Sequence, residues 1–156
     1  MKATTRDNLL AQCACFDLRK ATRAISRMYD DFLRDAGLTN AQYSLLVLIR
    51  DEKELSVSTL GRYMVMDRTS ITRALGPLQR DGLLGIRLGT DRRVRMVALT
   101  KKGHKLVEEA EPKWLRAQEA LMEVIGGDRW STMRTLIRDI IRKVRHRTID
   151  APTGAA

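Results

Sequence analysis

The stretch from Ser56 to Thr100 constrains the fold of this chain more than any other part of it. Its first half contains two short segments, about 57–64 and 68–80, whose apolar residues recur at three- and four-residue spacing, which indicates two helices. Ser56 and Asp67 stand directly before these segments, where serine and aspartate cap helix N-termini. The sequence therefore predicts a short helix, a turn and a second helix.

The second half of this stretch predicts two β-strands, at 83–88 and 94–99. Gly89, Thr90 and Asp91 lie between them and have the composition of a turn. A helix pair followed by a two-stranded hairpin is the pattern of a winged helix-turn-helix. We therefore expect a mainly α fold with a small β-hairpin wing.

Long segments with helical periodicity flank this stretch. They predict helices at about 9–36, 39–50, 100–125 and 128–147. Thr39 and Gln42 have the spacing of a capping box at the start of the second of these helices. Asp128 is expected to cap the last one.

The outer helices predict a dimer. We expect one domain over 1–150, with dimerisation helices at about 9–36 and 101–147, a winged helix-turn-helix at about 39–100 and a disordered tail at 151–156. Apolar stripes on long terminal helices need a second surface to cover them. The second helix of a helix-turn-helix is the one that binds DNA. A homodimer would place two such DNA-reading helices roughly 34 Å apart, about one DNA turn. The alternative is a monomer that folds these helices onto its own core.

The charge of the chain indicates an anionic partner. Its 156 residues include 29 Lys and Arg against 19 Asp and Glu, a net charge of +10. The stretch from Ser56 to Thr100 alone carries eight arginines against three aspartates. Nucleic acid or a membrane surface would suit this balance. Aromatic residues, at 4%, are too scarce to favour stacking of single-stranded bases.

The second helix of a helix-turn-helix presents its first residues to base edges in the major groove. Arginine pairs bidentately with guanine there. A narrow minor groove attracts arginine, which suits the hairpin tip, and we expect Asp91 to orient a neighbouring guanidinium. The DNA-binding candidates are Ser56, Arg68, Thr69, Ser70, Thr72, Arg73, Asp91, Arg92, Arg93 and Arg95.

A DRR…V.LT..G run follows the predicted helix-turn-helix, from Asp91 to Gly103. This run carries most of a resemblance to the MarR family of transcriptional regulators, which extends over nearly the full length of the chain. The resemblance implies a homodimeric repressor of a palindromic DNA duplex, with Arg93 in the minor groove and Asp91 in support of it. The matching residues are Ser56–Met64, Asp67–Leu75, Gly82 to Leu84 and Asp91 to Arg93, followed by Val97, Leu99, Thr100 and Gly103.

The resemblance also implies a small-molecule effector, an aromatic acid or an acyl-CoA-type ligand, in a cleft between the dimer helices and the DNA-binding lobe. Binding would favour a dimer whose DNA-reading helices no longer match the groove spacing. Alternatively, methionines and aromatics at helical spacing are core residues. The candidate lining residues are Arg19, Arg23, Met28, Tyr29, Tyr43, Met64, Met66 and Trp114.

Cys13 and Cys15 raise a thiol-based alternative. The peroxide-sensing branch of the MarR family has a reactive cysteine in its first helix, held by tyrosines. Two positions on a helix differ by roughly 200°, so we expect the two thiols to point apart and neither to bond each other nor to share a metal ion. In the competing interpretation, both cysteines are small apolar residues that pack in the dimer interface. Cys15, Tyr29 and Tyr43 match the peroxide-sensing pattern, whereas Arg19 and Asn40 replace two further tyrosines.

Other classes of protein receive little support. The sequence has no glycine-rich phosphate loop, H-E-x-x-H motif or nucleophile elbow, so we expect neither an enzyme nor a cofactor or metal. A nonspecific basic DNA-binding scaffold remains the alternative, and it would bind scrambled duplex as tightly as a true site. Without a long apolar run or a secretory signal, the chain is expected to be cytoplasmic and not to bind membranes.

Overall fold

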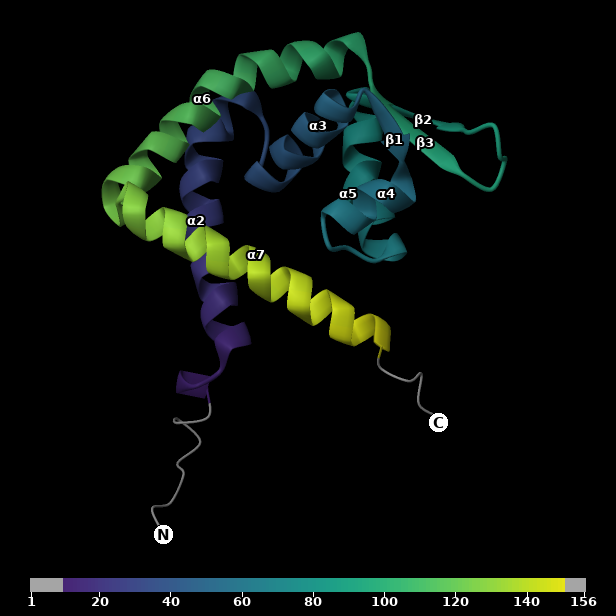
Figure 1. Ribbon diagram of the computed structural model, residues 1–156. Coiled ribbons are helices and arrows are strands. Elements are labelled where there is room, and N and C mark those ends of the chain that lie inside the picture. Colours follow the sequence, from purple (N-terminus) through teal and green to yellow (C-terminus); the bar gives the residue numbers. More distant parts are fainter. Residues whose placement is uncertain (1–9, 151–156) are drawn as a thin grey trace. The chain divides into compact units, whose positions relative to one another are not determined.

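The computed structural model describes residues 10–150, with side chains described as far as Arg145 (Figure 1). The tail predicted at 151–156 lies outside the described residues. The chain forms two compact units, one that ends at Ala117 and one that begins at Gln118. Within residues 10–150, the structure has no helix of the length and apolar character that a membrane crossing requires.

The first unit has its elements in the predicted order, and the mainly α fold with a small β wing is confirmed. They are α2 (Ala14–Leu33), the 3-10 helix η1 (Arg34–Ala36), α3 (Asn40–Glu52), β1 (Glu54–Ser56), α4 (Val57–Tyr63), α5 (Arg68–Arg80), β2 (Leu84–Leu88), β3 (Arg95–Leu99) and the first part of α6 (Lys101–Ile125).

The first predicted helix, 9–36, starts too early. The helix α2 begins at Ala14, and Cys13 before it is extended, with φ −87° and ψ 102°. Leu10 and Ala11 are helical, but Gln12 and Cys13 interrupt the helix before α2. At the other end η1 tightens the last turn, and Gly37 follows with φ 68°, as expected of a helix stop.

The helix α3 begins at the predicted capping box. Gln42 N donates to Thr39 Oγ1 at 3.3 Å, and Thr39 N donates to Gln42 Oε1 at 2.9 Å. Two backbone donors at the helix start are thereby paired. Tyr43, Leu46 and Ile49 are buried along α3, which places this helix in the core as its apolar sequence predicts.

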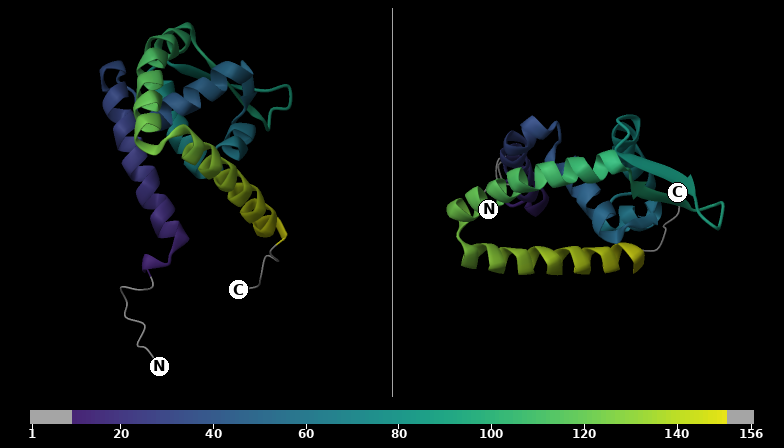
Figure 2. Two further views of the ribbon diagram at one scale, coloured as in Figure 1. Left: turned by 60° about the vertical axis from the view of Figure 1, so that its left-hand side comes forward. Right: turned by 90° about the horizontal axis from the view of Figure 1, so that it is seen from above.

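The sheet has a third strand that the sequence did not predict. The strands are ordered β1-β3-β2, and β1 pairs antiparallel with β3 so that Leu55 faces Val97. A strand of three residues is too short for alternation to be recognised. The hairpin of β2 and β3 with its connecting loop, here called the wing, projects away from α4 and α5 in every view (Figures 1 and 2).

The helix α5 packs one face into the core and leaves the other in solvent. Ile71, Leu75 and Leu78 are buried at the predicted spacing, and the helix is continuous through Pro77. The exposed face is therefore fixed by apolar packing on the opposite side. Other fully buried side chains of this unit are Leu33, Leu46, Ile49, Leu60, Val97 and Val107.

The second unit contains the end of α6 and the helix α7 (Gly127–Asp150). Gly126 separates the two helices with φ 84°. Asp128 lies in the first turn of α7 and does not precede it, so the predicted N-cap is wrong by two residues. A carboxylate in the first turn still favours the helix through its dipole. In the single chain, α7 exposes Leu136, Ile140 and Ile141.

Candidate nucleic-acid interface

The first turn of α5 is built around Asp67. Its carboxylate accepts from Ser70 N and from Ser70 Oγ, both at 2.8 Å. These two hydrogen bonds from Ser70 hold the pKa of Asp67 below its usual range, the backbone bond most strongly. Asp67 therefore caps the helix as predicted. It also accepts the one proton that the Ser70 hydroxyl can donate.

The exposed face of α5 carries Arg68, Thr69, Thr72 and Arg73. Thr72 Oγ1 donates to Arg68 O at 2.7 Å. The threonine oxygen is left with acceptor capacity only, because its single proton is used within the helix. The side chains of the two arginines and of Thr69 are exposed and can donate to a partner.

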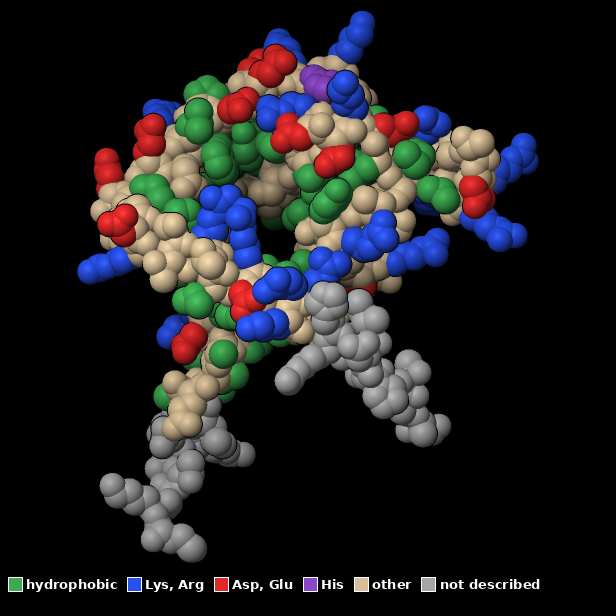
Figure 3. All heavy atoms as spheres, viewed as in Figure 1, with side chains coloured by type: hydrophobic (Ala, Val, Ile, Leu, Met, Phe, Trp, Pro, Cys, Tyr) green, Lys and Arg blue, Asp and Glu red, His purple; other side chains and the backbone are tan. Residues whose placement is uncertain are grey.

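The tip of the wing is a tight turn held by Asp91. Asp91 Oδ1 accepts from Arg93 N at 2.9 Å, and Val94 N donates to Asp91 O, also at 2.9 Å. The contact that the structure gives to this carboxylate is with the backbone and not with the guanidinium that we expected. Arg92 and Arg93 are exposed at the tip, and Figure 3 shows basic side chains with an acidic one among them at the free end of the hairpin.

An ion pair braces the base of the wing. Arg87 Nη2 lies 2.8 Å from a carboxylate oxygen of Glu54, which joins β2 to β1 across the sheet. Most of the Arg87 side chain is nevertheless exposed, and exposed pairs of this kind stabilise a fold only slightly. Arg95, a predicted DNA contact, is also exposed and lies opposite Leu88 in the hairpin.

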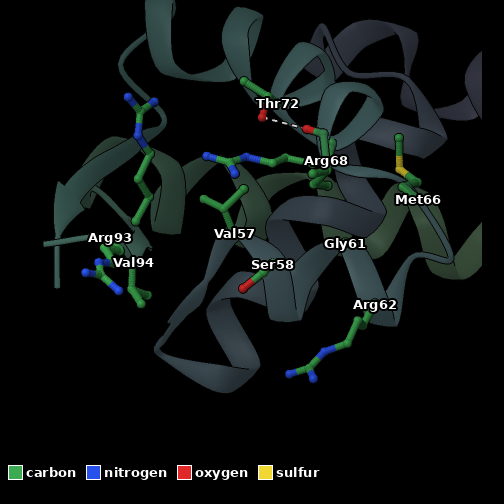
Figure 4. Close-up of a pocket in the computed structure, with 11 residues that line it drawn as sticks. Val57, Ser58, Gly61, Arg62, Met66, Arg68, Thr72, Arg93 and Val94 are labelled. Atoms are coloured by element: carbon green, nitrogen blue, oxygen red, sulfur yellow. Dashed lines mark hydrogen bonds between the residues drawn. The ribbon is translucent and has the colours of Figure 1, made fainter. Parts of the chain in front are cut away.

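A cavity of about 500 Å³ lies where α4, α5 and the wing meet. In Figure 4 the Arg68 side chain extends from α5 over Val57 toward the wing, while Arg93 and Val94 come from the wing itself. Four arginines and several apolar residues thus line one concave surface. Its lining residues are Val57, Ser58, Gly61, Arg62, Met66, Arg68, Ile71, Thr72, Arg93, Val94 and Arg95.

Two polar residues of this surface, Ser58 and Arg62, were not predicted from the sequence. Both are exposed on α4, and Arg62 Nη2 donates to Thr59 Oγ1 at 3.1 Å. Their position on the polar side of the first helix of the pair was a usable signal. Ser56, which was predicted, is half-buried, and its Oγ caps α4 by accepting from Thr59 N at 3.0 Å.

Three of the predicted effector residues come together within the chain. The rings of Tyr29 and Tyr43 are buried and each lies 6.0 Å from the ring of Trp114, centroid to centroid. Burial raises the pKa of both tyrosines. Of the remaining candidates, Met28 and Met64 are half-buried, Arg19 and Arg23 are exposed on α2, and Met66 lines the cavity beside the wing.

The cysteines differ from their predicted geometry. Cys13 precedes α2, so the expectation that both thiols sit on one helix about 200° apart is wrong. Cys15 is exposed in the first turn of α2, and Arg19 Nη2 lies 4.0 Å from its Sγ. Tyr29 follows fourteen residues later on the same helix, a rise of about 21 Å, so the two do not meet within one chain.

Comparison with known proteins agrees with this architecture. A model of the MarR family matches residues 36–94. The HTH-type transcriptional regulator SarZ of Staphylococcus saprophyticus is 31% identical over 104 residues, which are 66% of this chain and 71% of SarZ. An uncharacterized HTH-type transcriptional regulator of Bacillus subtilis, YwoH, is 28% identical over 67% of this chain and 77% of its own.

Solved structures extend the likeness over most of the chain. The transcriptional regulator MosR of Mycobacterium tuberculosis, solved in complex with DNA, is 32% identical, with a TM-score of 0.79 over 86% of this chain and 98% of MosR. MarR of Escherichia coli, 20% identical with a TM-score of 0.65 over 82% of this chain and 96% of its own, shares the fold. These relatives are transcriptional regulators and not enzymes. The chain belongs to the MarR family of transcriptional regulators.

Proposed function

We propose that this regulator binds double-stranded DNA sequence-specifically, as a homodimer on a palindromic operator, and represses transcription. The observation that carries the proposal is the cavity between α5 and the wing, where arginines from both elements face one surface. Acidic side chains are absent from its lining. Such a surface is electrostatically matched to a DNA backbone flanked by two grooves.

In this proposal α5 reads the major groove. Arg68, Thr69 and Arg73 would donate to base edges or phosphates, because their side chains are exposed. Ser70 and Thr72 would act as acceptors, since each already donates its hydroxyl proton within the helix. Ser56 would hold α4 in place against the DNA as a helix cap.

The wing would place its arginines in the neighbouring minor groove. Arg93 and Arg92 stand at the tip, where negative groove potential attracts a guanidinium. Asp91 supports the tip by fixing the backbone of Arg93. Arg95, nearer the base of the wing, would meet the phosphate backbone.

The exposed apolar residues of α7 favour a dimer. Leu136 is 59% exposed and Ile140, one turn later, is 46% exposed in the single chain. A second copy is the partner that a symmetric regulator offers to such a stripe. In the proposal the outer helices, at about 9–36 and 101–147, form this interface, and the two copies of α5 lie about one DNA turn apart.

Selection from random duplex DNA tests the function. The proposal predicts recovery of a palindrome with two half-sites about 10 base pairs apart, centre to centre. Enrichment of a single unpaired half-site would contradict the dimer. Failure to enrich any sequence, despite tight binding, would support the nonspecific scaffold.

We further propose that an aromatic acid or an acyl-CoA-type ligand releases the DNA. The cavity beside the wing favours this, because Val57, Met66 and Ile71 provide apolar surface next to guanidinium groups that can bind a carboxylate. An acid held there would compete with DNA for the same arginines. Titration of the protein–operator complex with benzoate-type acids and aryl-CoA thioesters checks this part, and complexes that survive all of them would contradict it.

A thiol-based response to peroxide is the second candidate. It is supported by the exposure of Cys15 at the start of α2. An organic hydroperoxide should then release the operator, a thiol reductant should restore binding, and Cys15→Ser should abolish the response. Release that persists in the Cys15→Ser protein would remove Cys15 from consideration.

A further inference from the structure

Two backbone hydrogen bonds close the end of α5. Leu83 N donates to Leu78 O at 2.9 Å, and Gly82 N donates to Gln79 O at 3.0 Å. With Gly82 at φ 70°, these bonds form a Schellman end. The direction in which the chain leaves α5 is therefore fixed within the helix end itself.

The first residues of α6 bind to this same end. Thr100 Oγ1 donates to Gly82 O at 2.7 Å and lies 3.2 Å from Leu83 O, which also accepts from Thr100 N at 3.1 Å. Lys102 Nζ donates to Asp81 O at 2.8 Å. Three consecutive carbonyl groups that close α5 are thus held by the residues that open α6.

The Thr100 hydroxyl has two partners on different elements. It accepts from Gly103 N at 3.1 Å and so caps α6, while its proton goes to the carbonyl of Gly82. The position needs one side-chain atom that both donates and accepts a hydrogen bond. Among side chains of this size, the hydroxyl groups of threonine and serine do so. One side chain therefore links the start of α6 to the end of α5.

The two backbones are also in direct contact at Gly103. A Cβ atom at this position would lie 2.0 Å from Leu83 O and 3.0 Å from Leu83 C. Backbone atoms cannot yield as the end of a flexible side chain can. Only glycine therefore fits at this position, where the start of α6 lies directly against the backbone that follows α5.

We propose that this joint, formed by Thr100, Lys102 and Gly103 against residues 81–83, sets the direction of α5 from α6 and thereby fixes the spacing of the two DNA-reading helices. Thr100 and Gly103 are positioning residues that do not touch DNA themselves. The inference rests on the proposed dimeric function. A displacement of α6 would therefore move the C-terminal end of α5 as well, because hydrogen bonds join the two directly.

A spacing series tests the joint. The selected operator is rebuilt with its two half-sites moved together or apart by one and two base pairs, and binding of each duplex is measured by anisotropy. The unmodified protein should prefer one spacing by about tenfold or more over its neighbours, because the DNA must otherwise be twisted to fit a rigid dimer. Thr100→Val, which keeps the shape but removes the hydroxyl, should reduce this preference to about threefold or less, and Thr100→Ser should restore it.

One control and one milder variant of the joint separate positioning from stability. Lys105→Ala removes a cation whose ion pair with Glu109 stays within α6, and it should keep the full spacing preference. Lys102→Ala removes an exposed contact to Asp81 O, and it should broaden the preference less than Thr100→Val does. If Thr100→Val does not fold, the Lys102→Ala result decides, with broadening in support and no broadening against.

The outcomes distinguish the joint from the function it serves. A folded Thr100→Val protein with an unchanged spacing preference would overturn the joint while leaving the dimeric regulator intact. An unmodified protein that binds every spacing equally would also overturn the joint, whereas selection of a single unpaired half-site would overturn the proposed dimeric function.

Discussion

The basic face of α5 and the wing is exposed, and hydrogen bonds to Asp67 and Asp91 hold its backbone. The aromatic cluster of Tyr29, Tyr43 and Trp114 is instead packed inside the same unit. Charged groups are costly to bury, so arginines on a folded domain stay available for a partner. Aromatic rings gain from burial and from contact with one another. Residue type thus predicts a binding face more securely when the face is charged than when it is apolar.

The largest expected effect is on the packed region. Trp114→Ala should lower the free energy of unfolding by about 3 kcal/mol, because both tyrosine rings lose their partner. The folded fraction should still bind the operator. Urea denaturation measures the change, and Tyr63→Ala, which removes a 56% exposed aromatic of α4, is the matched control with an expected loss under about 1 kcal/mol. A Trp114→Ala protein of normal stability would mean that the cluster is a pocket wall and not core.

The next effect is on sequence recognition by α5. Arg73→Ala should cost about 1–3 kcal/mol on the operator and much less on scrambled duplex, if its guanidinium reads a base. Arg80→Ala, at the far end of the same exposed helix, should change both affinities only slightly. Equal losses on both duplexes would reduce Arg73 to a phosphate contact.

The wing is expected to act mainly through charge. Arg93→Ala should weaken binding to every duplex and lower the slope of log affinity against log salt concentration by about 1, because one cation fewer displaces counterions. Anisotropy titrations at several salt concentrations give the slope. A slope equal to that of the unmodified protein would count against insertion of the wing into a groove.

Asp91 distinguishes two ways of supporting the wing. If the carboxylate acts by accepting from Arg93 N, Asp91→Asn should bind DNA nearly normally, since the amide oxygen can accept the same bond. Asp91→Ala should lose about 0.5–1.5 kcal/mol of binding free energy. If Asn and Ala are equally impaired, the negative charge is what matters, and the carboxylate orients a guanidinium as the sequence had suggested.

The smallest effect concerns the cap of α5. The pKa of Asp67 is lowered in the folded protein by hydrogen bonds from Ser70, so its contribution to stability is present above the ordinary carboxyl pKa of about 3.8 and is lost as pH falls through the folded value. Unfolding measured between pH 6 and pH 3 should therefore show a shallower acid loss in Asp67→Ala than in the unmodified protein. Identical pH profiles would mean that the cap contributes nothing measurable.

The sequence predicts most of the DNA-facing region because its signals are local. Ser56, Asp67 and Thr39 cap helices where expected, and Ile71 and Leu75 are buried at the expected spacing. Long-range features escaped it. The strand β1 depends on its pairing with β3, where Leu55 lies opposite Val97. The hydrogen bond from Thr100 to Gly82 likewise joins residues that are eighteen positions apart.

The effector residues stay a prediction for a different reason. Periodicity placed Tyr29 and Tyr43 on inward helix faces, but it could not tell a filled interior from an open cleft. In the single chain the ring of Trp114 lies 6.0 Å, centroid to centroid, from both tyrosine rings. The start of α2 was misplaced because an apolar stripe fixes which face a helix buries more firmly than where the helix begins.

The ratio of two dissociation constants tests the central claim most directly. Binding to the selected operator and to a scrambled duplex of equal length should be measured by anisotropy at near-physiological salt. A sequence-specific regulator should bind its operator about 10³-fold or more tightly than the scrambled duplex. Equal dissociation constants would contradict the account and leave a basic protein that binds DNA without reading it.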